Sequence, residues 1–170
     1  YSQMLKDEVA LSKEKMKKIN LKLIIKSVVD DFNSIYETKR GIKITLSDLN
    51  NLDEYNINGI ENRIEQIIAN LLDNSISFSD DNKKILVQIS KNENKDTILK
   101  VIDEGKGFKE KNTKKIFNRF YSNRPDNFGK HSGLGLNIVK NLVDLHGGTI
   151  NAYNNTTHKG ANVEITFPKS

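Results

Sequence analysis

The sequence predicts an α+β fold, a two-layer α/β sandwich in which helices lie on one face of a mixed β-sheet. Helix-like segments are concentrated early in the chain and strand-like segments late. Segments grouped in this way are typical of helices segregated to one face of a sheet. Helical spacing of apolar residues predicts helices at 21–40 and 60–78, and β-rich segments predict strands at 84–90, 97–102, 149–153 and 161–167.

The first predicted helix has a signal at each end. Asn20 is the expected N-cap, and Gly41 is the expected residue after the last turn. A strand at 42–46 follows, because apolar and polar residues alternate there. The buried face of the helix is expected to contain Leu21, Ile24, Ile25, Val28, Val29, Phe32, Ile35 and Tyr36.

The later elements are separated by polar connections. Residues 50–58 are predicted to form a loop with a short strand before the helix at Ile60–Phe78. A third helix, 134–145, ends at a Gly-Gly pair, and the last two strands form a hairpin. Residues 105–132 are rich in Gly, Asn and Lys, and a connection of that length is usually functional.

The length and composition indicate one globular domain with a real core, or one such domain plus a short appendage. The chain has 170 residues, of which 36% are hydrophobic and 29% charged. No apolar run approaches the ~20 residues that a transmembrane helix needs. The net charge of +5 is spread over mixed-sign runs, so we expect no nucleic acid partner. Because there is no cysteine, disulfides and thiol catalysis are excluded.

The first of three short motifs, Asn70-Leu71-Leu72-Asp73-Asn74, falls within the second predicted helix. Asn70 and Asn74 are four residues apart, so both side chains leave the same helix face, while Leu71 and Leu72 point toward the core. An amide oxygen is a suitable ligand for Mg²⁺ when phosphates and water complete its shell. Taken alone, the two asparagines also fit an exposed polar helix face.

The second motif, Asp103-Glu104-Gly105-Lys106-Gly107, ends a predicted strand. A carboxylate there can accept a hydrogen bond from an exocyclic amine such as that of adenine. The glycines let the backbone turn sharply and approach a planar ring. Taken alone, the motif also fits an ordinary tight turn.

The third motif, Ser132-Gly133-Leu134-Gly135-Leu136, precedes an apolar-periodic helix. Backbone amides at a helix N-terminus bind phosphate oxygens, and the helix dipole assists them. Arg119, Arg124 and Lys130 could reach the same phosphates, and Phe117 and Phe120 are expected to anchor the segment on the core. The alternative is a solvated basic loop. The order of the three motifs indicates a nucleotide site.

Together these segments resemble the catalytic and ATP-binding domain of sensor histidine kinases, within the Bergerat-fold superfamily shared with gyrase-type and Hsp90-type ATPases. The resemblance covers roughly Asn20 to Phe167. Its motifs are an asparagine box at Glu65–Phe78, a first glycine box at Val101–Phe108, a phenylalanine box at Ile116–Tyr121 and a second glycine box at Ser132–Val139.

The resemblance implies a role for each matching position. Asn74 is expected to bind Mg²⁺ and, with Arg119, to act in catalysis, while Asp103 binds the adenine of ATP. The segment Phe108–His131 is expected to be a lid over ATP. The remaining nucleotide-binding positions are Asn70, Phe78, Gly105, Gly107, Arg119, Arg124, Lys130, His131, Ser132, Gly133, Leu134, Gly135 and Leu136.

Several positions depart from the family pattern or discriminate within it. ATP-hydrolysing relatives have a Glu where this chain has Asn70, and an amide is a poor general base, so transfer to a protein side chain is favoured over hydrolysis. Ser77 stands where many relatives have a phosphate-binding Lys, and Phe78 where they often have Tyr. Lys130 and His131 replace frequent glycines.

The phosphoacceptor histidine of such kinases is not expected in this chain. None of His131, His146 and His158 has the acidic helical neighbours of that motif. Tyr1–Leu11 resembles the end of a dimerisation helix and Ser12–Ile19 a linker, so the predicted boundaries are 1–19 and 20–170. Alternatively, the apolar spacing at the start arises by chance in a lysine-rich linker.

The resemblance also implies partners and a location. The expected partners are a dimerisation and phosphoacceptor domain of the parent protein and a response regulator receiver domain. The parent is expected to be a membrane-anchored homodimer, with this chain as a cytoplasmic domain at the inner membrane. The run 120–136 resembles that of envelope-stress kinases of the ChvG type. Two alternatives are a serine kinase of the anti-sigma type and a nucleotide-sensing module without transfer.

Overall fold

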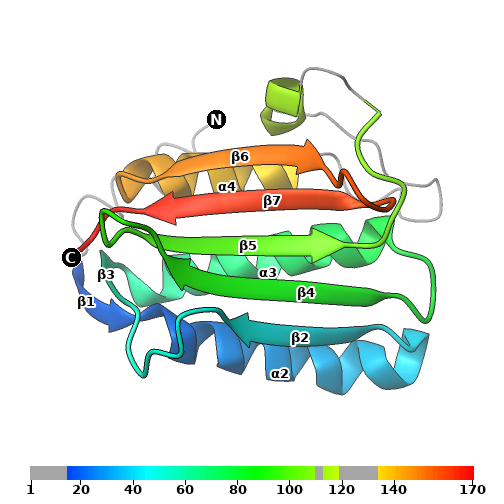
Figure 1. Cartoon of the computed structure of the whole chain (residues 1–170), viewed down its shortest axis with the longest axis horizontal. Helices are drawn as coiled ribbons and strands as arrows, with labels where there is room; N and C mark the ends of the chain where they lie inside the picture. Colours follow the sequence, from blue (N-terminus) through cyan, green and yellow to red (C-terminus); the bar gives the residue numbers. More distant parts are fainter. Residues whose placement is uncertain (1–14, 110–112, 119–133) are drawn as a thin grey trace.

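The computed structural model describes residues 15–109, 113–118 and 134–170. Its main sheet has five strands in the order β2-β4-β5-β7-β6. Figure 1 shows this sheet in front of the helices, which all cover one face, so the predicted two-layer α+β arrangement is confirmed. The strands are β2 (Lys43–Asp48), β4 (Lys84–Lys91), β5 (Thr97–Asp103), β6 (Thr149–Asn154) and β7 (Ala161–Phe167), and the helices are α2 (Leu21–Arg40), α3 (Glu61–Phe78) and α4 (Leu134–Leu145).

The sheet is mixed, as predicted. β2 pairs with β4 in parallel, and the other neighbours are antiparallel. Alternate residues of β4, β5 and β7 face the helices and are buried, because successive side chains of a strand point to opposite faces. These inward residues include Ile85, Val87, Ile89, Leu99, Val101, Val163, Ile165 and Phe167.

The predicted ends of α2 are confirmed. The side-chain oxygen of Asn20 accepts the N–H of Lys22 at 3.2 Å, and Gly41 ends the helix at φ 66°. The expected burial of Ile35 is wrong, because its side chain is 54% exposed. The C-terminal half of α2 is covered less than its N-terminal half, so helical spacing there no longer ensures burial.

An additional strand precedes α2. β1 (Lys17–Asn20) pairs in antiparallel fashion with β3 (Asn56–Gly59), the short strand expected within residues 50–58. Residues 17–19, which the sequence suggested as linker, therefore belong to the folded unit. One buried apolar residue, Ile19, is too weak a pattern to predict a strand. The expected helix at Tyr1–Leu11 lies outside the described residues.

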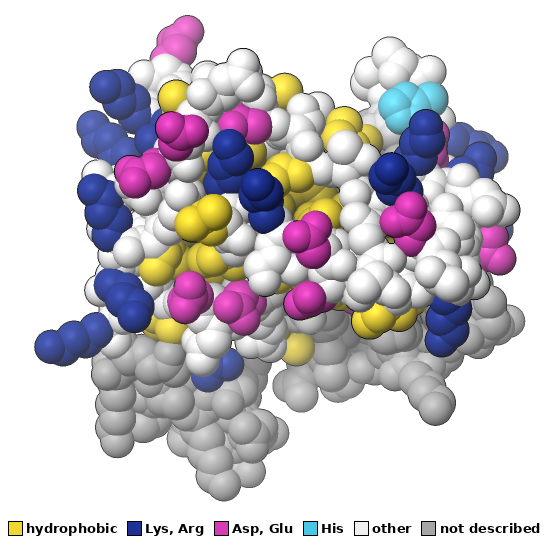
Figure 2. Space-filling view, turned by 90° about the horizontal axis from the view of Figure 1, so that it is seen from below, with side chains coloured by type: hydrophobic (Ala, Val, Ile, Leu, Met, Phe, Trp, Pro, Cys, Tyr) yellow, Lys and Arg dark blue, Asp and Glu magenta, His cyan; other side chains and the backbone are white. Residues whose placement is uncertain are grey.

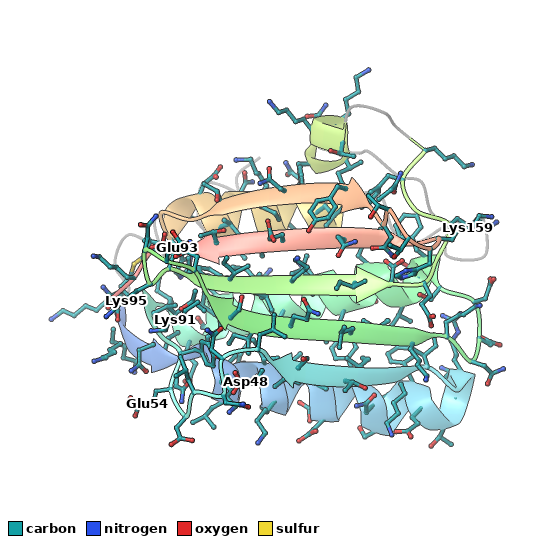
Figure 3. All side chains as sticks on the ribbon, viewed as in Figure 1. Asp48, Glu54, Lys91, Glu93, Lys95 and Lys159 are labelled. Atoms are coloured by element: carbon teal, nitrogen blue, oxygen red, sulfur yellow. The ribbon has the colours of Figure 1, made fainter. Side chains whose placement is uncertain are left out.

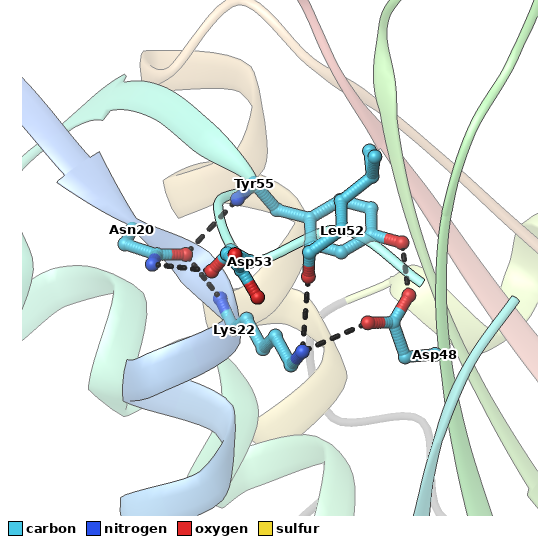
Figure 4. Close-up of polar contacts among 6 residues, drawn as sticks. All are labelled: Asn20, Lys22, Asp48, Leu52, Asp53 and Tyr55. Carbon is cyan, nitrogen blue, oxygen red and sulfur yellow. Dashed lines mark hydrogen bonds and ion pairs between the residues drawn. The ribbon is translucent and has the colours of Figure 1, made fainter. Parts of the chain in front are cut away.

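A polar network joins the start of α2 to the loop before β3 (Figure 4). Asn20 Oδ1 accepts the N–H of Tyr55 at 3.0 Å, and the hydroxyl of Tyr55 donates to Asp48. Lys22 Nζ lies 2.8 Å from Asp48 Oδ2 and donates to the carbonyl of Leu52 at 2.9 Å. The loop is thus tied to the helix at several points.

Hydrogen bonding in this network shifts two pKa values. Burial raises the pKa of Asp48, but the bonds from Lys22 and Tyr55 and the charge of Lys22 outweigh it and hold the value at about 2. Burial and the bond to Asp48 raise the pKa of Tyr55 to about 12.

Figure 3 places Asp48 and Glu54 at the same end of the sheet as Lys91, and Lys159 at the opposite end.

The edge of the molecule beside α2 carries both signs of charge. Figure 2 shows basic and acidic side chains interspersed there, with hydrophobic side chains between them. Leu23 and Ile35 of α2 are among the exposed large apolar residues.

Among the described residues, no helix has the length and apolarity to cross a bilayer.

Two long-range contacts hold α3 in place. Arg40, the last residue of α2, donates to the carbonyls of Ile76 at 2.9 Å and Ser79 at 2.6 Å, which fixes the C-terminal end of α3. At the other end, the N–H of Ile60 donates to Nε2 of His146 at 3.2 Å. The Nδ1 of that ring lies 2.7 Å from the carbonyl of Leu142. The hydrogen is assigned to Nδ1 because Nε2 is the acceptor.

Replacing His146 by Ala should destabilise the domain by about 2–4 kcal/mol. The change empties a buried site, leaves the N–H of Ile60 without its partner and removes the ring's bond to the carbonyl of Leu142, which keeps the backbone N–H of residue 146. Denaturant unfolding measures the loss. The exposed His158→Ala is the matched control and should stay within about 0.5 kcal/mol of the parent. Equal effects of the two changes would contradict the bridging role of His146.

The contribution of Asp48 to stability should disappear in acid. Its folded pKa of about 2 lies below the ordinary 3.8, so the folded state binds fewer protons than the unfolded state between these values. The stabilisation is complete above pH 3.8 and is lost as the pH falls toward 2. The difference in unfolding free energy between the parent and Asp48→Asn should shrink over that window. Asp31→Asn, at an exposed position of α2, should give no such pH-dependent difference.

Candidate nucleotide-binding site

Asp103 is the last residue of β5, and its carboxylate is buried at 2% exposure. Its Oδ1 accepts the N–H of Gly105 at 2.9 Å and the N–H of Ala161 at 3.1 Å. Neither of these bonds uses Oδ2. Two backbone donors on one oxygen hold the carboxylate in a defined direction, which a single recognition contact requires.

Burial raises the pKa of Asp103, although hydrogen bonds from Gly105, Ala161 and the hydroxyl of Ser75 act in the opposite direction. Ser75 belongs to α3 and directly follows Asn74. This contact therefore brings the asparagine helix and the end of β5 together, as a shared site requires. The sequence alone contained no signal for the role of Ser75.

Asn70 and Asn74 lie one turn apart on α3. The side chain of Asn74 is buried at 5% exposure, whereas Asn70 is half-buried. Leu71 and Leu72 are buried in the core, as predicted. In the described ranges, no three His, Cys, Asp or Glu side chains are grouped so that they could hold a metal ion.

Ser77 does not replace the lysine found in many relatives. Its side chain is buried, and its hydroxyl donates to the carbonyl of Asn74 at 2.9 Å. The hydroxyl is therefore used within the helix. Ser77 therefore supplies no positive charge at this position.

The two glycines after Asp103 are needed for close packing. A Cβ on Gly105 would lie 2.5 Å from the carbonyl oxygen of Phe78, and Gly107 has φ 79°, which L-residues rarely adopt. The backbone of the second motif thus passes directly over the end of α3. Phe78 itself is half-buried.

The segment that follows is anchored on the core. Phe108 is buried, and the 3₁₀ helix η1 (Thr113–Phe117) buries Ile116 and Phe117, so the predicted anchoring by Phe117 is confirmed. Asn137 of α4 donates to the carbonyl of Phe117 at 3.1 Å. Sequence reasoning missed Asn137, because nothing distinguishes it from other polar residues on a helix.

Leu134, Gly135 and Leu136 are the first residues of α4. Their N–H groups belong to the first turn, where backbone donors have no partner within the helix. The predicted phosphate contacts at Arg119, Arg124, Lys130, His131, Ser132 and Gly133, and the anchor Phe120, lie outside the described residues.

The hairpin between β6 and β7 also contributes to the site, and sequence analysis did not include it. Ala161 supplies a donor to Asp103, and Asn154 and Asn155 contact the segment 103–108. Asparagine and glycine are ordinary turn residues, so their presence in a predicted hairpin indicated only a turn.

The family model of the histidine kinase-, DNA gyrase B- and HSP90-like ATPases matches residues 59–170, well over half of the chain. The chain belongs to this family. It is an ATP-binding domain of the histidine kinase type, and the predicted family resemblance is confirmed.

The curated relatives include two ChvG sensor proteins, so the predicted likeness to the ChvG type is confirmed. That of Agrobacterium fabrum is 34% identical over 142 residues, covering 80% of this chain and 24% of the relative. That of Rhizobium meliloti is 32% identical over 153 residues, covering 86% of this chain and 26% of the relative. The chain thus spans about a quarter of the length of these relatives.

Solved structures share the fold. The catalytic domain of histidine kinase ThkA, in a nucleotide-free form, has a TM-score of 0.78 at 25% identity over 92% of this chain and 99% of that one. A mycobacterial sensor histidine kinase, MprB, has a TM-score of 0.73 at 21% identity over 90% of this chain and 97% of that one. The latter likeness shows the fold alone.

Replacing Gly105 by Ala should cost about 1–3 kcal/mol, because the new Cβ would overlap the main chain at Phe78 and one backbone would have to move. Thermal or denaturant unfolding measures the cost. Gly59→Ala is the control, because its Cβ would meet only side-chain atoms, none closer than 3.2 Å, and should cost less. If Gly105→Ala costs no more than this control, the close approach of the second motif to α3 is not needed.

Proposed function

We propose that this chain binds Mg-ATP and transfers the γ-phosphoryl group to a histidine on a dimerisation domain of its parent protein. The observation that carries the proposal is the buried Asp103, held by two backbone donors and in contact with α3 beside Asn74. A purine-binding group and a metal-binding group thereby meet at one end of the fold.

Asp103 recognises the adenine in this proposal. Its carboxylate is an acceptor and complements the exocyclic amino group of adenine, whereas guanine presents a carbonyl oxygen at the same position. The N–H groups of Gly105 and Ala161 fix the orientation of the carboxylate before the nucleotide arrives. Gly105 and Gly107 leave room for the planar ring beside the backbone.

Asn74 would hold the magnesium ion. The fit rests on its chemistry and place: a neutral amide on α3, one residue from the contact with Asp103, with no cluster of acidic ligands among the described residues. A hard cation with one amide ligand can complete its shell with phosphates and water. When bound, Mg²⁺ would neutralise charge on the phosphates.

The first turn of α4, with Leu134, Gly135 and Leu136, binds phosphate oxygens through its N–H groups. Ser132 and Gly133 extend this contact, and Arg119, Arg124, Lys130 and His131 supply further phosphate contacts from the lid. Because Ser77 is engaged within α3, these residues take the place of the missing lysine.

In the transfer step a histidine nitrogen attacks the γ-phosphorus in line with the leaving oxygen. An N–P bond forms, the bond between the γ-phosphorus and the bridging oxygen breaks, and ADP leaves with that oxygen. Asn70 cannot act as a general base toward water, so its amide disfavours hydrolysis relative to transfer. Phe78 and Asn70 complete the nucleotide pocket.

The parent protein, in this proposal, is a membrane-anchored homodimer that passes the phosphoryl group to a response regulator receiver domain. One of the solved structures with this fold contains ThkA bound to a response regulator, TrrA. This chain would then be the cytoplasmic ATP-binding part from β1 (Lys17–Asn20) to residue 170, and residues 1–11 would be the end of a dimerisation helix.

The proposal predicts a specific pattern of losses. Asn74→Ala should abolish phosphoryl transfer to a supplied dimerisation domain, and Asp103→Ala should weaken ATP binding at least about tenfold, as expected for a lost charge-assisted hydrogen bond. The exposed Asn141→Ala and Asp31→Ala are matched controls and should retain both activities. Calorimetry measures binding, and radiolabel transfer measures the reaction.

The stability of the product decides the acceptor. A phosphohistidine is labile in acid, whereas an acid-stable product would indicate serine transfer and would contradict the proposed acceptor. Binding of nucleotide without transfer in the intact parent protein would favour a sensing module. No saturable binding at millimolar nucleotide would overturn the proposal altogether.

A further inference from the structure

Asn154, the last residue of β6, and Asn155, which follows it, contact the two ends of the turn 103–108. Asn155 Nδ2 donates to the carbonyl oxygen of Asp103 at 3.2 Å. Asn154 Oδ1 accepts the N–H of Phe108 at 2.6 Å, and its Nδ2 donates to the carbonyl of Phe108 at 3.1 Å. The turn that begins with the carboxylate proposed to bind purine is therefore held from a separate hairpin.

The amide of Asn155 has an assigned direction. Asn162 Nδ2 donates to Asn155 Oδ1, so Nδ2 is left to face Asp103. The same Nδ2 lies 3.1 Å from Nε2 of His158. The carbonyl of Asp103 can only accept, so the amide nitrogen of Asn155 faces it and the amide oxygen faces Asn162.

The hairpin and Asp103 are packed as closely as backbone atoms allow. Gly160 has φ 142°, and a Cβ there would lie 2.0 Å from the carbonyl oxygen of Asp103. The N–H of Asn155 donates to the carbonyl of Gly160 at 2.9 Å and closes the hairpin, and the next residue, Ala161, donates to Asp103 Oδ1. One hairpin thus holds both the main chain and the carboxylate of Asp103.

We propose that Asn155 is a positioning residue for adenine recognition, acting through Asp103. The inference rests on the proposed function, because it requires that Asp103 binds the amino group of adenine. Asn155 holds the carbonyl of Asp103, and Ala161 holds the carboxylate. Loss of the first contact frees the peptide unit after Asp103 to rotate, and the carboxylate loses its direction.

The test compares two ligands on this 170-residue chain. ATP carries the 6-amino group, and purine riboside 5′-triphosphate lacks it but is otherwise the same. Asn155→Ala should weaken ATP binding about tenfold, the order expected for one lost hydrogen bond at a buried carbonyl. Binding of the analogue should change by less than about twofold, because it makes no contact that depends on the direction of the carboxylate.

Two further variants make the comparison sharp. Asn155→Asp keeps the shape of the side chain but replaces the donor by an acceptor that faces a carbonyl. It should therefore weaken ATP binding at least as much as Asn155→Ala does, and it should leave binding of the analogue unchanged. It also serves if the alanine variant does not fold. The control is Asn151→Ala on the exposed side of β6, which should leave both affinities unchanged.

Asp103→Ala separates the possible outcomes. If it removes the preference for ATP over the analogue but the Asn155 variants keep that preference, the positioning role is wrong and the proposed function stands. Equal weakening of both ligands in the Asn155 variants would indicate general damage to the hairpin and would overturn the inference. If Asp103→Ala itself leaves the preference intact, the adenine role of Asp103 fails and the inference fails with it.

Discussion

The hydrogen bonding of one buried carboxylate is the constraint on which the site depends. Asp103 is almost fully buried, and an unpartnered buried charge would cost several kcal/mol. The donors that meet this need come from Gly105, Ala161 and Ser75. These residues belong to the turn after β5, the start of β7 and the helix α3, so satisfying one side chain brings three parts of the chain together.

The architecture makes this convergence possible. The helices α2, α3 and α4 lie on one face of the sheet, and α3 packs against β5, the central strand. The C-terminal end of α3 therefore lies at the edge where β5 ends and β7 begins. Arg40 and His146 fix the two ends of α3, which keeps Asn74 and Ser75 in place relative to Asp103.

The opposite end of the sheet is organised separately. There the network of Asn20, Lys22, Asp48 and Tyr55 ties the first helix to the loop before β3. This network contributes to stability and holds β1 against the fold, but it lies far along the sheet from the hairpin that carries Lys159 (Figure 3). The network around Asp48 and the network around Asp103, which we propose binds nucleotide, thus occupy different ends of the sheet.

The sequence by itself determined what depends on neighbours along the chain. Asn20 and Gly41 mark the two ends of α2, the β-rich segments predicted the strands β4 and β5, and the spacing of Asn70 and Asn74 placed both on one helix. Only the tertiary structure decided the exposure of Ile35, the pairing of Lys17–Asn20 and the partners of Asp103. The bond from Ala161 spans 58 residues, and contacts between such distant backbone groups leave no periodic signal in a sequence.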